Sequence, residues 1–113
     1  MPEKQYRIAA EDMVALVSGW GAATATDRVT VDGRMIGYAY RERPVNGADS
    51  GWRFFAGDED DAYMADASRH DFYAVNTIAN YDPAILSILD SAIGSAFERD
   101  QTGPWREVGD AQN

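Results

Sequence analysis

The first part of the chain alternates short apolar runs with polar turns, a pattern typical of strands. Residues 13–18 form a continuous apolar run (MVALVS) of the length of a buried strand, and a helix beginning at Ala9 fits the same run. Residues 19–26 are small and polar, so we interpret them as a loop. Runs this short do not by themselves separate a strand from a helix.

A hairpin is the sharpest local prediction. Asp32-Gly33 lies between residues 29–31 and residues 34–41, which contain β-branched and aromatic side chains. An Asp-Gly pair in this position favours a type I′ turn, because both central residues of that turn need a positive φ. We therefore expect two antiparallel strands here.

Residues 52–56 predict a further strand, after a turn-rich loop at residues 44–51. Successive side chains of a strand point to opposite faces. Trp52 and Phe54 should therefore share one face of this strand, and Arg53 and Phe55 the other, with the tryptophan and the phenylalanines as candidates for the core.

The second part of the chain mixes helix and strand signals. The acidic residues 58–61 precede a helical turn at residues 62–65, where they complement the helix dipole. Asp82-Pro83 is a cleaner helix start, with an N-cap aspartate and a proline at the first helical position. That helix should end near Ser91. Strands are expected at residues 93–99 and 105–108.

This order of elements predicts an α+β fold. We expect a single domain over residues 1–113, built on a mainly antiparallel sheet of four to six strands with two or three short helices. Residues 1–8 and 109–113 are expected to be flexible termini.

The amino-acid composition excludes several classes of protein. The chain has 113 residues, a net charge of −9 and no cysteine, which excludes disulfides and thiolate zinc sites. The acidic balance argues against binding to nucleic acid, which needs clustered lysine and arginine. With no apolar run of about 18 residues and no signal-peptide pattern, we expect a cytoplasmic protein with no membrane contact.

The negative charge is concentrated in residues 49–82, which contain eight acidic residues and only two arginines. The run Asp58, Glu59, Asp60 and Asp61 does not fit a calcium loop of the EF-hand type, since the required glycine and glutamate positions hold Tyr63 and Arg69. Such an asymmetry bears on partners and on association rates rather than on the fold.

Catalytic and cofactor motifs are absent from the sequence. No serine lies in a Gly-x-Ser-x-Gly elbow, no phosphate-binding glycine motif is present, and the one histidine, His70, reads as a surface-loop residue. We therefore expect a non-catalytic protein without a cofactor or a metal site.

Several stretches together resemble a bacterial family first described as domain of unknown function 2185 and later grouped as the immunity protein 33 family of polymorphic toxin systems. The longest is the segment DSGWRFFAGDEDD at residues 49–61. Three others agree in order and spacing: GYAYRE at residues 37–42, VNTIANYDP at residues 75–83, and LDS at residues 89–91 running into GSAFER at residues 94–99. The likeness spans about residues 13–99 and departs from the pattern between residues 19 and 34.

The resemblance implies a protein that binds a cognate toxin and blocks it, and it supplies no catalytic residue. Charge complementarity then predicts that an acidic surface meets a basic toxin, such as a nuclease domain. The partner-binding residues that we predict are Asp58, Glu59, Asp60, Asp61, Tyr63, Tyr81 and Asp82, with the tyrosines as anchors. The alternative is a regulatory module that binds a small molecule or a divalent metal through residues 58–61 and 76–82.

Overall fold

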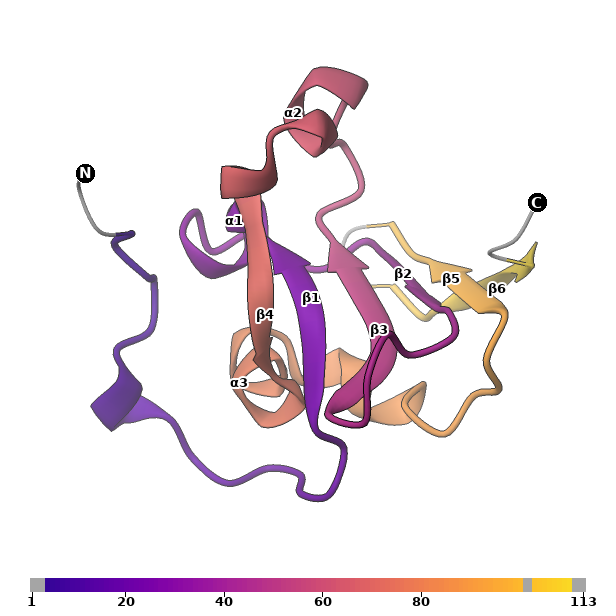
Figure 1. The fold of residues 1–113 in the computed structure, drawn as a ribbon, viewed down its shortest axis with the longest axis horizontal. Coiled ribbons are helices and arrows are strands. Elements are labelled where there is room, and N and C mark those ends of the chain that lie inside the picture. The colour runs from indigo at the N-terminus through magenta and orange to yellow at the C-terminus, as the bar shows by residue number, and fades with distance from the viewer. Residues whose placement is uncertain (1–3, 101–102, 111–113) are drawn as a thin grey trace.

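The computed structural model describes residues 4–100 and 103–110. Its centre is a six-stranded sheet in the order β4-β1-β3-β2-β5-β6 (Figure 1). The strands are β1 (Ala22–Thr26), β2 (Tyr38–Arg41), β3 (Asp49–Phe55), β4 (His70–Ala74), β5 (Ser95–Glu98) and β6 (Arg106–Asp110). Neighbouring strands are antiparallel except β1 and β3, which are parallel.

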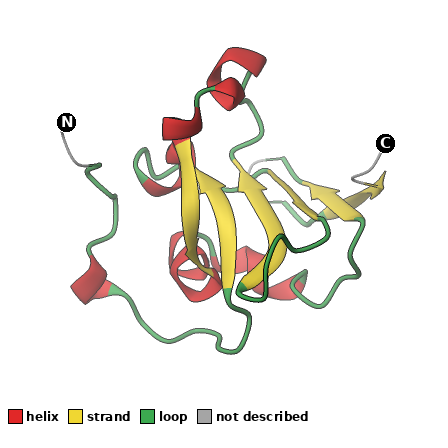
Figure 2. Cartoon of the chain, in the orientation of Figure 1, coloured by secondary structure: helices red, strands yellow, loops and turns green. Residues whose placement is uncertain are grey.

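Helices cover one face of this sheet and leave the other open (Figure 2). The α-helices are α1 (Asp27–Thr30), α2 (Asp61–Ala65) and α3 (Val75–Tyr81), and the 3₁₀ helices are η1 (Ala10–Asp12), η2 (Ala67–Arg69) and η3 (Pro83–Ser87). The core is formed between the strands and α3 with η3. On the other face, α2 lies at one end, beyond the ends of β3 and β4 (Figure 1).

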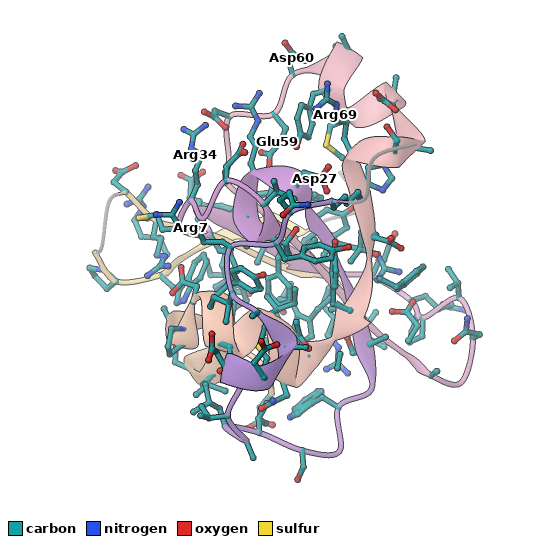
Figure 3. All side chains as sticks on the ribbon, turned by 90° about the vertical axis from the view of Figure 1, so that its left-hand side faces the viewer. Arg7, Asp27, Arg34, Glu59, Asp60 and Arg69 are labelled. Atoms are coloured by element: carbon teal, nitrogen blue, oxygen red, sulfur yellow. The ribbon has the colours of Figure 1, made fainter. Side chains whose placement is uncertain are left out.

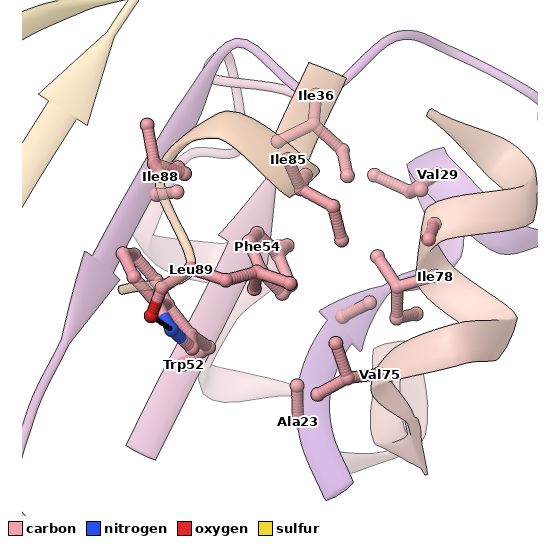
Figure 4. Close-up of a cluster of buried hydrophobic side chains, with 13 residues drawn as sticks. Ala23, Val29, Ile36, Trp52, Phe54, Val75, Ile78, Ile85, Ile88 and Leu89 are labelled. Carbon is pink, nitrogen blue, oxygen red and sulfur yellow. Dashed lines mark hydrogen bonds between the residues drawn. The ribbon is translucent and has the colours of Figure 1, made fainter. Parts of the chain in front are cut away.

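The core forms around the inward side of β3 (Figure 4). Trp52 and Phe54 are fully buried and stacked, with ring centroids 5.6 Å apart. The indole Nε1 of Trp52 donates a hydrogen bond to the carbonyl oxygen of Leu89 at 3.2 Å, which satisfies the one polar atom of this side chain. Ile78 and Ile85 close the core from α3 and η3.

The structure confirms the α+β class and the mainly antiparallel sheet. The predicted alternation in β3 is also confirmed, because Trp52 and Phe54 point into the core while Arg53 and Phe55 lie on the open face. The strand begins earlier than expected, at Asp49, inside the segment that we read as a loop.

Two predictions for the first part of the chain are wrong. Residues 13–18 form no strand, and the supposed loop at residues 19–26 contains β1, which pairs with both β3 and β4. The small side chains Ala23 and Ala25 are fully buried in the core that α3 closes. Tertiary packing therefore outweighs the low strand propensity of alanine.

The predicted hairpin is also wrong. Residues 27–30 form α1, and Asp32-Gly33 ends this helix instead of joining two strands. The amide of Arg34 donates to the carbonyl oxygen of Arg28 at 2.9 Å, and Gly33 has a φ of 74°. A glycine in the left-handed region just past a helix is a common helix ending, so the same dipeptide serves a different turn.

The second part of the chain is closer to expectation. The aspartate of Asp82-Pro83 caps a helix as predicted, although η3 is a 3₁₀ helix that ends at Ser87 rather than near Ser91. The strands near the C-terminal end are confirmed as β5 and β6. Three elements were not predicted: η2, α3, and β4, in which His70 lies at the start of a strand rather than in a surface loop.

Candidate functional site

The open face of the sheet carries a row of side chains that comes from four strands. Thr24 on β1 pairs with Phe72 on β4 and with Arg53 on β3, and Arg53 pairs in turn with Tyr40 on β2. Paired residues point to the same face of a sheet. The strand register therefore brings residues 24, 40, 53 and 72 side by side.

This row forms the floor of a cleft. Two cavities of about 410 Å³ and 300 Å³ lie on the open face, and both are lined by Tyr40, Phe55 and Met64. Met64 belongs to α2, which thus lies over one end of the cleft. We call this region the open-face cleft and define it by Tyr38, Tyr40, Arg53, Phe55, Met64 and Phe72.

Four aromatic rings, of Tyr38, Tyr40, Phe55 and Phe72, line the cleft. The ring centroid of Phe55 lies 5.8 Å from that of Tyr38 and 5.6 Å from that of Tyr40, both in stacked geometry. Phe72 is 50% exposed, and its ring lies 5.9 Å from the guanidinium carbon of Arg53. These rings cross the open face of the sheet from β4 to β2, and α2 covers only one end of the cleft that they line.

Arg53 is held rigidly in the floor of the cleft. Its guanidinium donates to both carboxylate oxygens of Asp49, at 2.9 and 2.8 Å, and to Glu42 at 2.7 Å. Asp49 also accepts hydrogen bonds from the amides of Val45 and Gly51. Two carboxylates thus surround one guanidinium, and the group has a net negative charge.

This arrangement shifts the pKa values of both partners. Hydrogen bonding from Arg53 holds the pKa of the Asp49 carboxyl well below its usual range, and the same contact raises the pKa of Arg53. A carboxyl group whose pKa is lowered by folding stabilises the native state above its unfolded pKa, and loses that contribution as the pH falls through the folded value.

We therefore expect Asp49→Asn to lower the free energy of unfolding by about 1.5–3 kcal/mol at neutral pH, the range for a hydrogen bond to a charged group. The difference from the wild type should be constant above about pH 5 and shrink as the pH falls below about 4. Urea denaturation of both proteins between pH 2 and 7 measures this. A difference that stays constant down to pH 2 would contradict the role given to the ionised Asp49.

The predicted acidic run is partly neutralised within the molecule. Asp58 forms ion pairs with Arg34 at 2.6 Å and with Arg28 at 3.4 Å. Glu59 points inward (Figure 3) and accepts hydrogen bonds from the hydroxyl of Thr26 and the amides of Ala56 and Gly57. These two carboxylates connect the segment before α2 to Thr26 on β1 and to Arg28 and Arg34.

The other two acids of the run are exposed. Asp60 caps α2 by accepting a hydrogen bond from the amide of Tyr63 at 2.8 Å, and it lies at the outer end of the molecule in Figure 3. Asp61 makes no hydrogen bond or ion pair with any described residue. Tyr63 is half-buried: its hydroxyl accepts from the amide of Arg28, and its ring lies 4.6 Å from the Arg28 guanidinium carbon.

Tyr81 and Asp82 lie elsewhere, at the C-terminal end of α3 in the helical layer. The hydroxyl of Tyr81 contacts the amide and the carbonyl group of Ile8. Asp82 is 8% exposed and forms an ion pair with the buried Arg99. The structure does not bring these two residues together with the acidic run.

The described residues show neither a metal centre nor a membrane span. Within residues 4–100 and 103–110, no three His, Asp or Glu side chains converge to hold a metal ion. None of the helices in these ranges is long and apolar enough to cross a membrane.

Sequence reasoning missed the open-face cleft. Tyr38 and Tyr40 were recognised as sharing one face of a strand, and Phe55 as lying opposite Trp52 and Phe54, but their common surface depends on the strand order. Phe72 lies on β4, which was not predicted. The sequence also does not show that helices cover only one face of the sheet. Because they do, the side of β3 that carries Phe55 lies at the surface.

Together these features define a small α+β domain with one helix-covered sheet face and one open, aromatic face. The chain belongs to the Imm33 family: the model described as Immunity protein Imm33 domain matches residues 23–109. This confirms the family resemblance. No curated protein and no solved structure is significantly similar to the chain. Membership suggests a toxin-neutralising role, and proteins of this kind are generally non-catalytic.

Proposed function

We propose that this protein neutralises a cognate toxin by binding it through the open-face cleft, without catalysis. The observation that carries the proposal is the row of aromatic side chains on the open face, the partly exposed Tyr38, Tyr40 and Phe55 beside the 50% exposed Phe72, in a domain of the Imm33 family. Large exposed apolar patches on small proteins mark interaction sites. In the helical layer, Val75, Ile78 and Ile85 are buried in the core instead.

The aromatic side chains suit the short-range part of binding. Tyrosine and phenylalanine supply a large contact area at a small cost in conformational entropy, because each has two side-chain torsions. Tyr40 lies at the middle of the cleft, between Phe55 and the fixed Arg53. Residues at the centre of an interface, surrounded by contacts that exclude water, make the largest energetic contributions.

Charge favours a basic partner. The chain has a net charge of −9, and Arg53 and Glu42, which line the cleft, form a negatively charged group with the buried Asp49. A lysine or arginine side chain of the toxin would lie between the rings of the cleft, where cation–π attraction stabilises it. A toxin whose own function requires contact with phosphate, such as a nuclease domain, presents side chains of this kind.

Within the acidic run, Asp60 and Asp61 are exposed and would attract such a partner, whereas Asp58 and Glu59 are bound within the molecule. We expect the double variant Asp60→Asn/Asp61→Lys to slow association with the toxin by about one order of magnitude at low salt, and to flatten the salt dependence of the rate. Asparagine at residue 60 keeps the cap of α2. Stopped-flow kinetics at several salt concentrations measures the effect.

The matched control is Asp90→Lys/Glu107→Gln, which changes the net charge by the same amount at exposed positions away from α2. Its association rate should fall much less. Equal rates for the two variants would show that only total charge matters, and would remove Asp60 and Asp61 from the mechanism.

The function itself is tested by co-expression with a toxin domain encoded beside the gene for this chain. We expect the wild type to restore growth and to form a stable complex with the toxin. Because the proposed mechanism is stoichiometric, purified protein should abolish toxin activity at a 1:1 ratio. Full inhibition at a small fraction of that ratio would point to an enzyme, and no inhibition at any ratio would contradict the proposal.

A small-molecule site is the second candidate, because the larger cavity of about 410 Å³ falls within the range of ligand pockets. A thermal-shift screen with nucleotides and divalent cations separates the two candidates. A ligand present at 100 times its Kd stabilises a protein by about 2.7 kcal/mol. The toxin-binding proposal expects no shift across the screen.

A further inference from the structure

An N-terminal arm, residues 4–19, lies outside the region that matches the family and yet contacts the domain at several points. In Figure 1 it is the indigo and violet segment that passes to one side of β4 and α3 before it enters β1. It carries the apolar run at residues 13–18, which is not paired with any described strand.

Two asparagines on α3 hold this run. The side chain of Asn80 accepts from the amide of Val14 at 3.0 Å and donates to the carbonyl oxygen of the same residue at 2.9 Å. Asn76 accepts from the amides of Leu16 and Val17, at 2.7 and 3.0 Å, and donates to the Val14 carbonyl oxygen at 2.9 Å. The two asparagines lie one helical turn apart, so they form a single surface.

These contacts involve only the main chain of the arm. The side chains of Val14 and Leu16 point away, being 57% and 41% exposed. A surface that satisfies the amide and carbonyl groups of a passing segment is a site for a polypeptide chain. Four of the five hydrogen bonds are solvent-exposed and the one from the Val17 amide is part-buried. Segments held mainly by exposed hydrogen bonds open at low cost in free energy.

The contacts nearer the N-terminus select this particular arm. The amide of Ile8 donates to the hydroxyl of Tyr81, and the ring of Tyr6 meets that of Tyr73 edge-on at 5.8 Å between centroids. Lys4 forms an ion pair with Asp27 at 2.9 Å. A second copy of this chain carries an arm that satisfies every one of these contacts.

The connection between arm and domain allows the arm to leave. Gly19 has a φ of 85°, and no atom lies within 4 Å of the position that a side chain would occupy. A glycine in open space can change its backbone torsions without a steric penalty. Exchange of an element across such a connection is a low-cost route to a dimer.

We propose that the site formed by Asn76 and Asn80 holds the arm of a second copy, so that two chains associate by exchanging arms. The site lies in the helical layer, opposite the open-face cleft, and the proposal does not depend on toxin binding.

Complementation between two full-length variants tests it. Leu16→Pro removes one of the two amides that donate to Asn76, and we expect it to release the arm while the site stays intact. Asn76→Ala/Asn80→Ala destroys the site while the arm stays intact. We expect each variant alone to be monomeric in light scattering and native mass spectrometry. An equimolar mixture should form a heterodimer, because a free arm then meets a free site.

The wild type should dimerise only at higher concentration, since its own arm competes for the site. Leu16→Ala keeps the amide and is the matched control. Mixed with Asn76→Ala/Asn80→Ala, it should form no more heterodimer than the wild type forms with that double variant. A mixture that stays monomeric, with both variants folded by circular dichroism, would overturn the proposal. So would a dimer of either variant alone, or a wild type that is monomeric at every concentration.

Discussion

Replacing Asp82 with alanine is expected to lower the free energy of unfolding by about 3–5 kcal/mol, the range for removing one partner of a buried ion pair. The carboxylate of Asp82 accepts from the amide of Ile36 at 2.9 Å and from that of Ala84 at 3.2 Å. It also neutralises Arg99, which is buried and would be left without its counter-charge. Urea denaturation at neutral pH measures the loss.

Asp90 provides the matched control. It lies eight residues further along the chain, is exposed, and makes no hydrogen bond or ion pair with any described residue. Asp90→Ala should change the stability by no more than about 0.5 kcal/mol. If Asp82→Ala were equally mild and instead weakened toxin binding, the residue would belong to the partner surface and its structural role would be wrong.

The second large effect is expected in the open-face cleft. Tyr40→Ala should raise the Kd of the toxin complex by about 30-fold or more, which corresponds to the roughly 2 kcal/mol typical of a residue at the centre of an interface. The ring of Tyr40 stacks on that of Phe55 and lines both cavities of the cleft. Isothermal titration calorimetry with the purified toxin domain measures the change.

Two further variants show whether the effect is specific to this ring. Tyr40→Phe keeps the aromatic ring and should retain most of the affinity. Leu86→Ala removes an exposed apolar side chain from η3, on the covered side of the sheet, and should leave the Kd unchanged. A loss of affinity for Leu86→Ala equal to that for Tyr40→Ala would show that the partner does not bind the open face.

The parts of the fold that sequence could predict are those decided by local signals. The alternation of residues 52–55 and the helix start at Asp82-Pro83 both depend on neighbouring residues alone, and both are found. The strand β1 escaped prediction because its small residues owe their place to packing against distant elements. Asp32-Gly33 was misread because the same dipeptide ends a helix as readily as it turns a hairpin.

The candidate site shows a similar division. The position of Asp60 at the start of a helix follows from local sequence, as predicted. The partners of Asp58 are Arg28 and Arg34, more than twenty residues away, so no local pattern reveals that its charge is neutralised. The cleft depends on the order of the strands, and a one-dimensional pattern does not contain that order.

A positively charged side chain placed inside the open-face cleft tests the central claim most directly. Thr24 lies in the cleft floor between Arg53 and Phe72, and Thr24→Arg would fill the space proposed for a basic side chain of the toxin. Leu86→Arg adds the same charge on the covered side. With both variants folded, we expect Thr24→Arg to weaken toxin binding at least 100-fold and Leu86→Arg to bind as the wild type does. Wild-type affinity in Thr24→Arg would contradict the claim.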